Sequence, residues 1–361
     1  MYFFPGSGRR YFSIIFAAMQ LNEDTLQKAQ QLIEGARTIL ITNHVNPDGD
    51  AVGSALGLAQ VLRSMGKEVK CVFPNYFSPN LRWMSGVKEV LYYDSQRSLA
   101  DTALQEAELM IHLDYNALGR SGDMEQALRQ ISTPKINIDH HQQPENFAEA
   151  NLCIPGASST CEVVVHFLEQ TGLYQHLQKS GAECLYSGII TDTGNFRFNS
   201  TTAQTHEVVA HLIALGVKPD WVANRIYDNN RPERLKLLGC ALENMEILPD
   251  VNAAIICLRA EELERYNFKK GDTEGFVNYG LSIEGITLAA FFYPRDGGVK
   301  MSFRSIGAVD VNKLARLHFN GGGHVNAAGA YLPITLAEAI QKLKDVLPQY
   351  LQENQFEKAN I

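Results

Sequence analysis

The stretch TILITNHVNPDGDAVGS, residues 38–54, decides the fold of the first part of the chain. Its apolar, β-branched beginning, residues 38–42, predicts a buried strand. The helical pattern of residues 55–63 follows and ends before Gly66. Because the polar turn between them follows the carboxyl end of a strand, we expect it at the edge where open α/β sheets bind ligands.

The side chains of His44, Asp48 and Asp50 crowd this turn. An imidazole and two carboxylates so close together would repel one another or stay unpaired in a core, unless a cation held them. Carboxylate oxygens and a neutral imidazole suit Mn, Mg, Zn or Fe(II) better than a soft metal. The alternative is a solvated turn whose aspartates cap the next helix. The turn alone leaves both interpretations open.

The composition bounds the size and the partners of the protein. A chain of 361 residues with 45% hydrophobic residues is long enough for two domains. The formal net charge of −8 argues against a broad surface for long nucleic acid, yet bound metals could still attract a phosphate substrate. Six cysteines without a CxxC pair suit reduced thiols, and no apolar run reaches transmembrane length. We therefore expect a cytoplasmic protein.

The pattern of elements divides the chain. Residues 1–20 are expected to be a disordered extension, with Met19 as an alternative translation start. Strands then alternate with helices, which predicts an α/β domain with a doubly wound, mainly parallel sheet over residues 21–216. Residues 217–235 predict a helical linker. A hairpin and flanking helices predict a smaller, mixed α+β domain over residues 236–351.

Three further polar clusters follow predicted strands or helices of the first domain: Asp114, Asp139-His140-His141 and Asp192. Each is weak alone, because an aspartate after a strand is more often a cap or turn residue. Asp192 begins an Asp-Thr-Gly tripeptide of the kind found in aspartic proteases, but those need a second such carboxylate in β-rich lobes. Jointly, the clusters would supply ligands for two metals with a shared carboxylate, a site that hydrolyses phosphate esters.

The order and spacing of these segments resemble the DHH/DHHA1 phosphoesterase family. The matching motifs are His-x-x-Pro-Asp-x-Asp-Ala from His44, the strand-terminal Asp114, Asp-His-His from Asp139, Asp-Thr-Gly from Asp192, and Gly-Gly-Gly-His-x-x-Ala-Ala-Gly from Gly321. The resemblance extends from about residue 20 to residue 350. Within the family, the chain is most similar to the bifunctional oligoribonuclease/pAp phosphatase (nanoRNase) branch.

The resemblance implies two divalent metal ions, Mn²⁺ foremost, with Mg²⁺ or Co²⁺ as alternatives. It implies that one ion is held by His44 and Asp48, the other by Asp50, His140 and Asp192, and that Asp114 bridges them. Asp114 and His141 would be the catalytic residues, with His141 close to the phosphate. Asp139 is expected to orient a histidine ring rather than to bind metal.

Substrate binding is expected from His141, Arg120, Arg304, Gly322, Gly323 and His324. Consecutive glycines let backbone N–H groups approach an anion closely, and an arginine can clamp a phosphate with two hydrogen bonds. The alternatives are an ordinary glycine loop that caps a helix, and surface arginines. The sequence alone does not separate these interpretations.

The implied activity is hydrolysis of short oligoribonucleotides to mononucleotides and removal of the 3′-phosphate of pAp. One alternative is a phosphodiesterase for linear or cyclic dinucleotides such as pGpG, pApA or c-di-AMP. Another is a nucleotide-binding sensor without catalysis. The expected partners are short oligonucleotides or nucleotide phosphates, with neither long duplex DNA nor a membrane, and a homodimer is the assembly considered.

Overall fold

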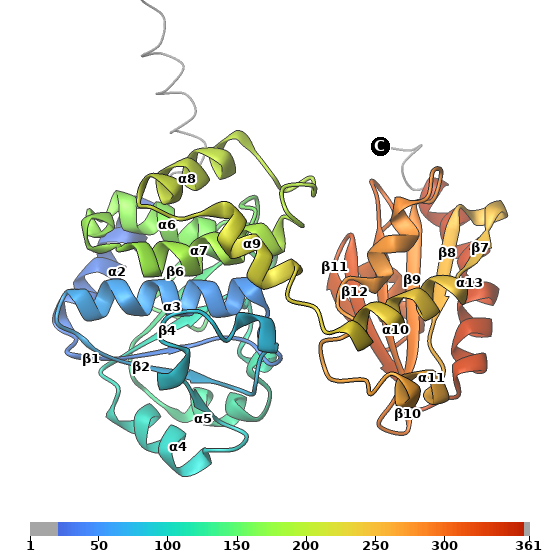
Figure 1. Ribbon diagram of the computed structural model, residues 1–361. Coiled ribbons are helices and arrows are strands. Elements are labelled where there is room, and N and C mark those ends of the chain that lie inside the picture. Colours follow the sequence, from blue (N-terminus) through green and yellow to red (C-terminus); the bar gives the residue numbers. More distant parts are fainter. Residues whose placement is uncertain (1–20, 357–361) are drawn as a thin grey trace, which may run out of the picture. The chain divides into compact units, whose positions relative to one another are not determined.

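The computed structural model describes residues 21–356, apart from the side chains of His324 and of residues 354–356. The chain divides after Asn229 into two compact units, and each unit has a six-stranded sheet of its own (Figure 1). The extension predicted for residues 1–20, with its alternative translation start, lies outside the described residues.

The first unit is built on a parallel sheet. Its strands are β1 (Thr38–Thr42), β2 (Glu68–Phe73), β3 (Leu91–Tyr92), β4 (Leu109–Leu113), β5 (Lys135–Asp139) and β6 (Ala150–Cys153). Their order is β3-β2-β1-β4-β5-β6, and all neighbouring pairs are parallel. The predicted doubly wound sheet is confirmed. The strand order reverses between β1 and β4, and ligands bind outside the carboxyl ends of strands at such a switch point.

Helices cover both faces of this sheet (Figure 1). They are α2 (Glu23–Gly35), α3 (Gly49–Ser64), α4 (Arg97–Glu106), α5 (Glu125–Gln130), α6 (Thr160–Gln170), α7 (Lys179–Asp192), α8 (Ala203–Ala214) and α9 (Pro219–Tyr227). Short 3-10 turns occupy Pro79–Leu81, Val87–Glu89, Leu118–Met124 and Leu173–His176. Successive side chains of β1 point to opposite faces of the sheet. Ile39 and Ile41 pack with α3, α6 and α7 on one face, and Leu40 packs with α4 and α5 on the other.

Helices α3 and α7 approach each other closely through glycines. A Cβ atom on Gly53 would lie 2.4 Å from the carbonyl oxygen of Cys184, and one on Gly49 would lie 2.3 Å from Thr191 Oγ1. α3 begins at Gly49, inside the segment that the sequence indicated as a turn, so Asp50 belongs to its first helical turn. The contact between these two helices thus fixes Asp50 against α7.

We predict that Gly53→Ala destabilises the protein by about 1–3 kcal/mol, because the added methyl group meets backbone rather than a movable side chain. Urea unfolding measures this change. Gly35→Ala is the matched control: its Cβ would have nothing within 4 Å, so it should be neutral or slightly stabilising. Equal stability of the Gly53→Ala variant and the wild type would contradict the close packing of α3 and α7.

A chain of ion pairs joins α6 to α8. His166 of α6 lies 3.8 Å from Glu162 and 3.6 Å from Glu169, and Glu169 lies 2.7 Å from His211 of α8. Burial lowers the pKa of His166, but its partners Glu162 and Glu169 outweigh burial and raise that pKa to about 9, from an ordinary value of 6.5. The charged imidazole therefore stabilises the folded state.

We predict that this contribution is complete below about pH 6.5 and is lost as the pH rises through about 9, because only the folded state holds the proton in that window. The free energy of unfolding of His166→Gln should fall below that of the wild type by on the order of 1–3 kcal/mol at pH 6, and the gap should narrow by pH 9.5. Chemical denaturation at several pH values measures it. A gap that stays constant with pH would show that His166 is not charged in the folded protein.

The second unit is a mixed sheet. Its strands are β7 (Glu246–Leu248), β8 (Ala253–Cys257), β9 (Leu288–Arg295), β10 (Gly298–Ser305), β11 (Gly322–His324) and β12 (Ala327–Leu332), in the order β11-β12-β10-β9-β8-β7. β8 and β9 are parallel and the other pairs antiparallel. The predicted hairpin is present: Asp296 and Gly297 join β9 to β10 with positive φ angles of 50° and 79°, as a tight hairpin turn requires.

Helices pack on both faces of this sheet as well. They are α10 (Pro232–Glu243), α11 (Ala260–Arg265), α12 (Val311–His318) and α13 (Leu336–Phe356), with 3-10 turns at Pro249–Val251 and Phe276–Ser282. One apolar cluster joins the sheet to α12 and α13, and another joins it to α10 and α11. The mixed α+β architecture predicted for this unit is confirmed. Within residues 21–356, no helix is both long enough and apolar enough to span a membrane.

Candidate metal centre

The turn after β1 presents two polar side chains. Asp48 caps α3, because its Oδ1 accepts hydrogen bonds from the N–H groups of Asp50 and Ala51. The capping role that the sequence left open therefore applies to Asp48. His44 Nδ1 lies 2.9 Å from its neighbour's carbonyl oxygen, Val45 O, so an Nδ1–H donates there and Nε2 is left as a ligand atom. His44 Nε2 lies 4.0 Å from Asp48 Oδ1.

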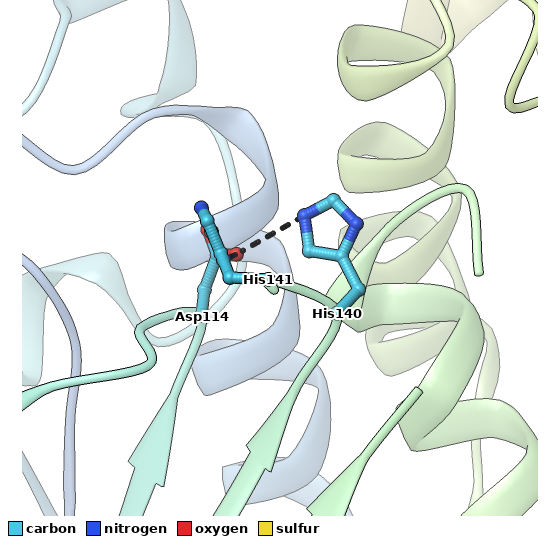
Figure 2. A group of neighbouring side chains, drawn as sticks. All are labelled: Asp114, His140 and His141. Carbon is cyan, nitrogen blue, oxygen red and sulfur yellow. Dashed lines mark ion pairs between the residues drawn. The ribbon is translucent and has the colours of Figure 1, made fainter. Parts of the chain in front are cut away.

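Asp114 follows β4 on the other side of the switch point. Its φ of 64° is left-handed, a conformation that aspartate tolerates better than most residues. The two oxygens of its buried carboxylate face different histidines: Oδ2 lies 3.4 Å from His44 Nε2, and Oδ1 lies 3.6 Å from His140 Nε2 and from His141 Nδ1. Figure 2 shows Asp114 beyond the end of its strand with the rings of His140 and His141 beside it. Asp114 is thus placed to bridge.

A further group forms where β5, α3 and α7 meet. His140 Nε2 lies 3.3 Å from Asp192 Oδ2 and 3.8 Å from Asp50 Oδ2. The ligand atoms of these three residues lie within 4.8 Å of one another. The same holds for His44, Asp48 and Asp114, and for Asp114, His140 and His141. All residues that the sequence proposed as metal ligands therefore converge.

Asp139 supports one of these histidines. Its buried carboxylate oxygen Oδ1 lies 2.7 Å from His141 Nδ1. An Nδ1–H that donates to Asp139 fixes the ring and directs His141 Nε2 away from this contact. The orienting role expected for Asp139 thus has a direct structural counterpart.

Burial and like charge make the carboxylates difficult to ionise together. Burial, and then the charge of Asp114, raises the pKa of Asp50 to about 8. Burial, and then Asp50, raises the pKa of Asp192 well above its ordinary value. Burial opposes ionisation of Asp114 too, but His44 and the neighbouring histidines lower its pKa. Divalent cations would offset this crowding of negative charge, and the set of carboxylate oxygens and imidazole nitrogens fits them.

Arg120 lies at the rim of this group. Its carbonyl oxygen accepts a hydrogen bond of 2.8 Å from the N–H of Val45, next to His44. Its guanidinium is half-buried, and its positive charge slightly opposes the rise that burial and neighbouring carboxylates cause in the pKa of Asp192. The structure therefore brings Arg120 to the metal centre, as the substrate role proposed for it requires.

The remaining candidates belong to the second unit. Arg304 on β10 pairs with Ala327 on β12, and Ala327 pairs with His324 on β11, so the three backbones share one row of the sheet. Gly322 and Gly323 belong to β11, an edge strand, and so do not form the helix-capping glycine loop that was the alternative interpretation. The side chain of His324 lies outside the described structure.

Strand pairing explains the glycines of this segment. A Cβ on Gly321 would lie 2.2 Å from the carbonyl oxygen of Gly329, and one on Gly323 would lie 2.3 Å from that of Ala327. The N–H of Gly323 already donates to Asn312 Oδ1 at 2.9 Å. Two of the glycines are therefore needed for backbone approach within the sheet, whatever the segment binds.

Sequence reasoning missed Thr160. Its N–H donates to Asp50 Oδ2 at 2.6 Å and its hydroxyl donates to Asp114 Oδ1 at 3.0 Å. The sequence Ser158-Ser159-Thr160 is typical of a helix start, and α6 (Thr160–Gln170) begins there. No sequence signal distinguished it, because its full burial against these two carboxylates is seen only in the structure.

Comparison with known proteins agrees with this geometry. The model of the DHH family, N-terminal domain, matches residues 38–189, and that of the DHHA1 domain matches residues 251–353. The bifunctional oligoribonuclease and PAP phosphatase NrnA of Thermus thermophilus is 31% identical over 87% of this chain and 90% of its own length. The cyclic-di-AMP phosphodiesterase PdeA of Listeria monocytogenes is 27% identical over 90% of this chain, but this match spans only 49% of PdeA.

A solved structure extends the comparison. The crystal structure of an exopolyphosphatase-related protein from Bacteroides fragilis superposes with a TM-score of 0.90, at 37% identity, over 93% of this chain and 98% of that one. The fold and the centre define a metal-dependent phosphoesterase class. The chain belongs to the DHH family, with a DHHA1 domain after its DHH domain.

We predict that Asp114→Asn weakens binding of both metal ions by at least about 100-fold, because Asp114 faces both ligand groups. Asp48→Asn should weaken the binding of only one ion, since Asp48 belongs to one ligand group and its side chain is 57% exposed. Titration of each metal-free variant with Mn²⁺ in a calorimeter measures this. Retention of one ion at wild-type affinity in a folded Asp114→Asn protein would contradict the bridging position.

Proposed function

We propose that this protein hydrolyses short oligoribonucleotides to mononucleotides and removes the 3′-phosphate of pAp, with two divalent ions, foremost Mn²⁺, and Mg²⁺ or Co²⁺ as alternatives. The observation that carries the proposal is the carboxylate of Asp114, whose two oxygens face separate ligand groups. Similarity to a relative named an oligoribonuclease and PAP phosphatase, over 90% of that relative's length, supports the substrate class.

Six side chains would hold the ions: His44 and Asp48 on one, Asp50, His140 and Asp192 on the other, and Asp114 on both. Ions bound there would polarise the phosphoryl oxygens. They would also lower the pKa of a bound water towards neutrality, so that hydroxide is available as the nucleophile. The carboxylates of Asp50 and Asp114 are held in place by hydrogen bonds from the protein, so little reorganisation is needed when substrate binds.

His141 would act on the phosphate directly. Asp139 accepts a hydrogen bond from its Nδ1 and so fixes the ring through which His141 would contact a phosphoryl oxygen. Arg120, whose carbonyl oxygen accepts a hydrogen bond from Val45 next to His44, would add positive charge at the rim of the centre. These two groups complement negative charge as it develops on the phosphate.

The second unit would bind the nucleotide end of the substrate. Arg304 and His324 lie in one row of its sheet, beside Gly322 and Gly323. A guanidinium can hold a terminal phosphate with two parallel hydrogen bonds. The net charge of −8 is consistent with short substrates rather than with long nucleic acid.

Similarity to PdeA favours a second candidate, a phosphodiesterase for linear or cyclic dinucleotides. The match covers half of that relative, whereas the oligoribonuclease relative is matched over nearly its whole length, so the first candidate is preferred. All six cysteines are free thiols, which supports a reducing compartment such as the cytoplasm.

We predict Mn²⁺-dependent release of mononucleotides from RNA two to five nucleotides long and of phosphate from pAp, with slower turnover of c-di-AMP and of long RNA. Initial rates for these substrates and for pyrophosphate, with Mn²⁺, Mg²⁺ or Co²⁺, measure the preference. An Asp192→Asn protein purified in the same way should be inactive and excludes a contaminating nuclease.

Turnover of pyrophosphate without turnover of any nucleotide would overturn the proposal. Faster turnover of c-di-AMP than of pAp and short RNA would select the second candidate. Tight nucleotide binding without turnover of any substrate would identify a sensor instead.

A further inference from the structure

Thr160 contacts the carboxylate of Asp50, which belongs to one ligand group, and that of Asp114, which faces both groups. Its backbone N–H donates to Asp50 Oδ2 at 2.6 Å, and its Oγ1 donates to Asp114 Oδ1 at 3.0 Å. Thr160 is fully buried, so water does not compete for either hydrogen bond. One residue thus connects a carboxylate from α3 with a carboxylate from the end of β4.

The hydroxyl of Thr160 sets the rotation of the Asp114 carboxylate. The terminal torsion of an aspartate has a broad, soft energy profile, so the backbone alone does not decide where each oxygen points. With Oδ1 held by Thr160 on the side of His140, Oδ2 is directed to His44. The bridging orientation of Asp114 therefore depends on this hydrogen bond.

The start of α6 sets the position of Asp50. Its Oδ2 accepts from the N–H of Thr160, and its Oδ1 accepts from the N–H of Cys161 at 2.9 Å. These are N–H groups of a helix's first turn, which have no partner within the helix and favour negative charge. Asp50 is therefore fixed relative to Thr160, and through Thr160 relative to Asp114.

The segment that carries Thr160 is itself held firmly. Ser159 caps α6 by accepting a hydrogen bond from the N–H of Glu162. The buried carboxylate of Glu162 in turn accepts from the N–H and hydroxyl of Ser158, and from Thr205 Oγ1 of α8 at 3.1 Å. Thr160 is thus part of a rigid support rather than a side chain that adapts to the carboxylates.

We propose that Thr160 is a positioning residue that couples the two ion sites, so that both form together around correctly oriented Asp50 and Asp114. The inference rests on the proposed two-metal function and adds a residue that neither the motifs nor the family comparison assigns. Loss of the hydroxyl should affect both ions although Thr160 binds neither. Loss of a partner that orients a ligand typically weakens metal binding by about 10- to 100-fold.

The test uses the full chain in metal-free form, titrated with Mn²⁺ by calorimetry and electron paramagnetic resonance. Wild type should take up ions as spin-coupled pairs. Thr160→Val, which keeps the shape but not the hydroxyl, should bind both ions about 10- to 100-fold more weakly and show the signal of isolated Mn²⁺. Thr160→Ser keeps the hydroxyl and should restore paired binding. Turnover should fall in Thr160→Val through kcat more than through KM.

Thr171→Val is the matched control. It makes the same substitution at the other end of α6, where the hydroxyl donates to the carbonyl oxygen of Phe167, and it should leave metal binding unchanged. If Thr160→Val does not fold by circular dichroism, Thr160→Ala replaces it with less steric demand. Paired Mn²⁺ at wild-type affinity in the folded hydroxyl-free variant would overturn the inference, and so would failure of Thr160→Ser to restore pairing. Wild type that binds no ion pair would instead overturn the proposed two-metal function.

Discussion

Buried negative charge at the switch point of the first sheet is the constraint on which the rest of this unit depends. Isolated carboxylates are too costly to bury without compensation, yet Asp50 and Asp114 have almost no exposed surface. The protein compensates in two ways: the first turn of α6 donates to Asp50, and His44 and His140 approach Asp114. Burial, and then the charge of Asp114, still raises the pKa of Asp50, so these contacts offset only part of the cost of its charge. Divalent cations at these carboxylate oxygens and imidazole nitrogens would supply the missing compensation.

Helix packing serves this centre directly. Asp192 ends α7 and Asp50 lies in the first turn of α3, so the distance between their carboxylates depends on how closely the two helices pack. Glycines at the contact allow their backbones to meet, and a side chain at Gly188 would collide with Cys161 Sγ and with Asp50 itself. Apolar packing alone would tolerate residues of several sizes at such positions. Larger residues would move Asp50 away from Asp192. The need to keep these two carboxylates close explains why small residues lie at this contact.

Much of this arrangement could be predicted from the sequence, because β-branched runs, helical periodicity and polar residues at strand ends are local signals. These signals located His44, Asp114 and Asp192 at one edge of a parallel sheet, where the structure has them. What they could not reveal depends on tertiary contact. Thr160 resembles an ordinary residue at a helix start until α6 is placed against Asp50 and Asp114. The strand β11 could not be predicted either, because consecutive glycines have no strand propensity and its strand character arises from pairing with β12.

In the proposed function, the two units would make different contributions: the first to catalysis and the second to substrate selection. A pair of ions recognises phosphate and water, which every phosphoester presents, so the first unit can supply reactivity but little discrimination between nucleotides. Relatives named for oligoribonucleotides and for a cyclic dinucleotide both match about nine-tenths of this chain. Since the ligand set suits either reaction, selection must come from groups beyond it. In the proposed function, Arg304 on β10 would serve that purpose, and a change of Arg304 would then alter substrate preference without disturbing the ions.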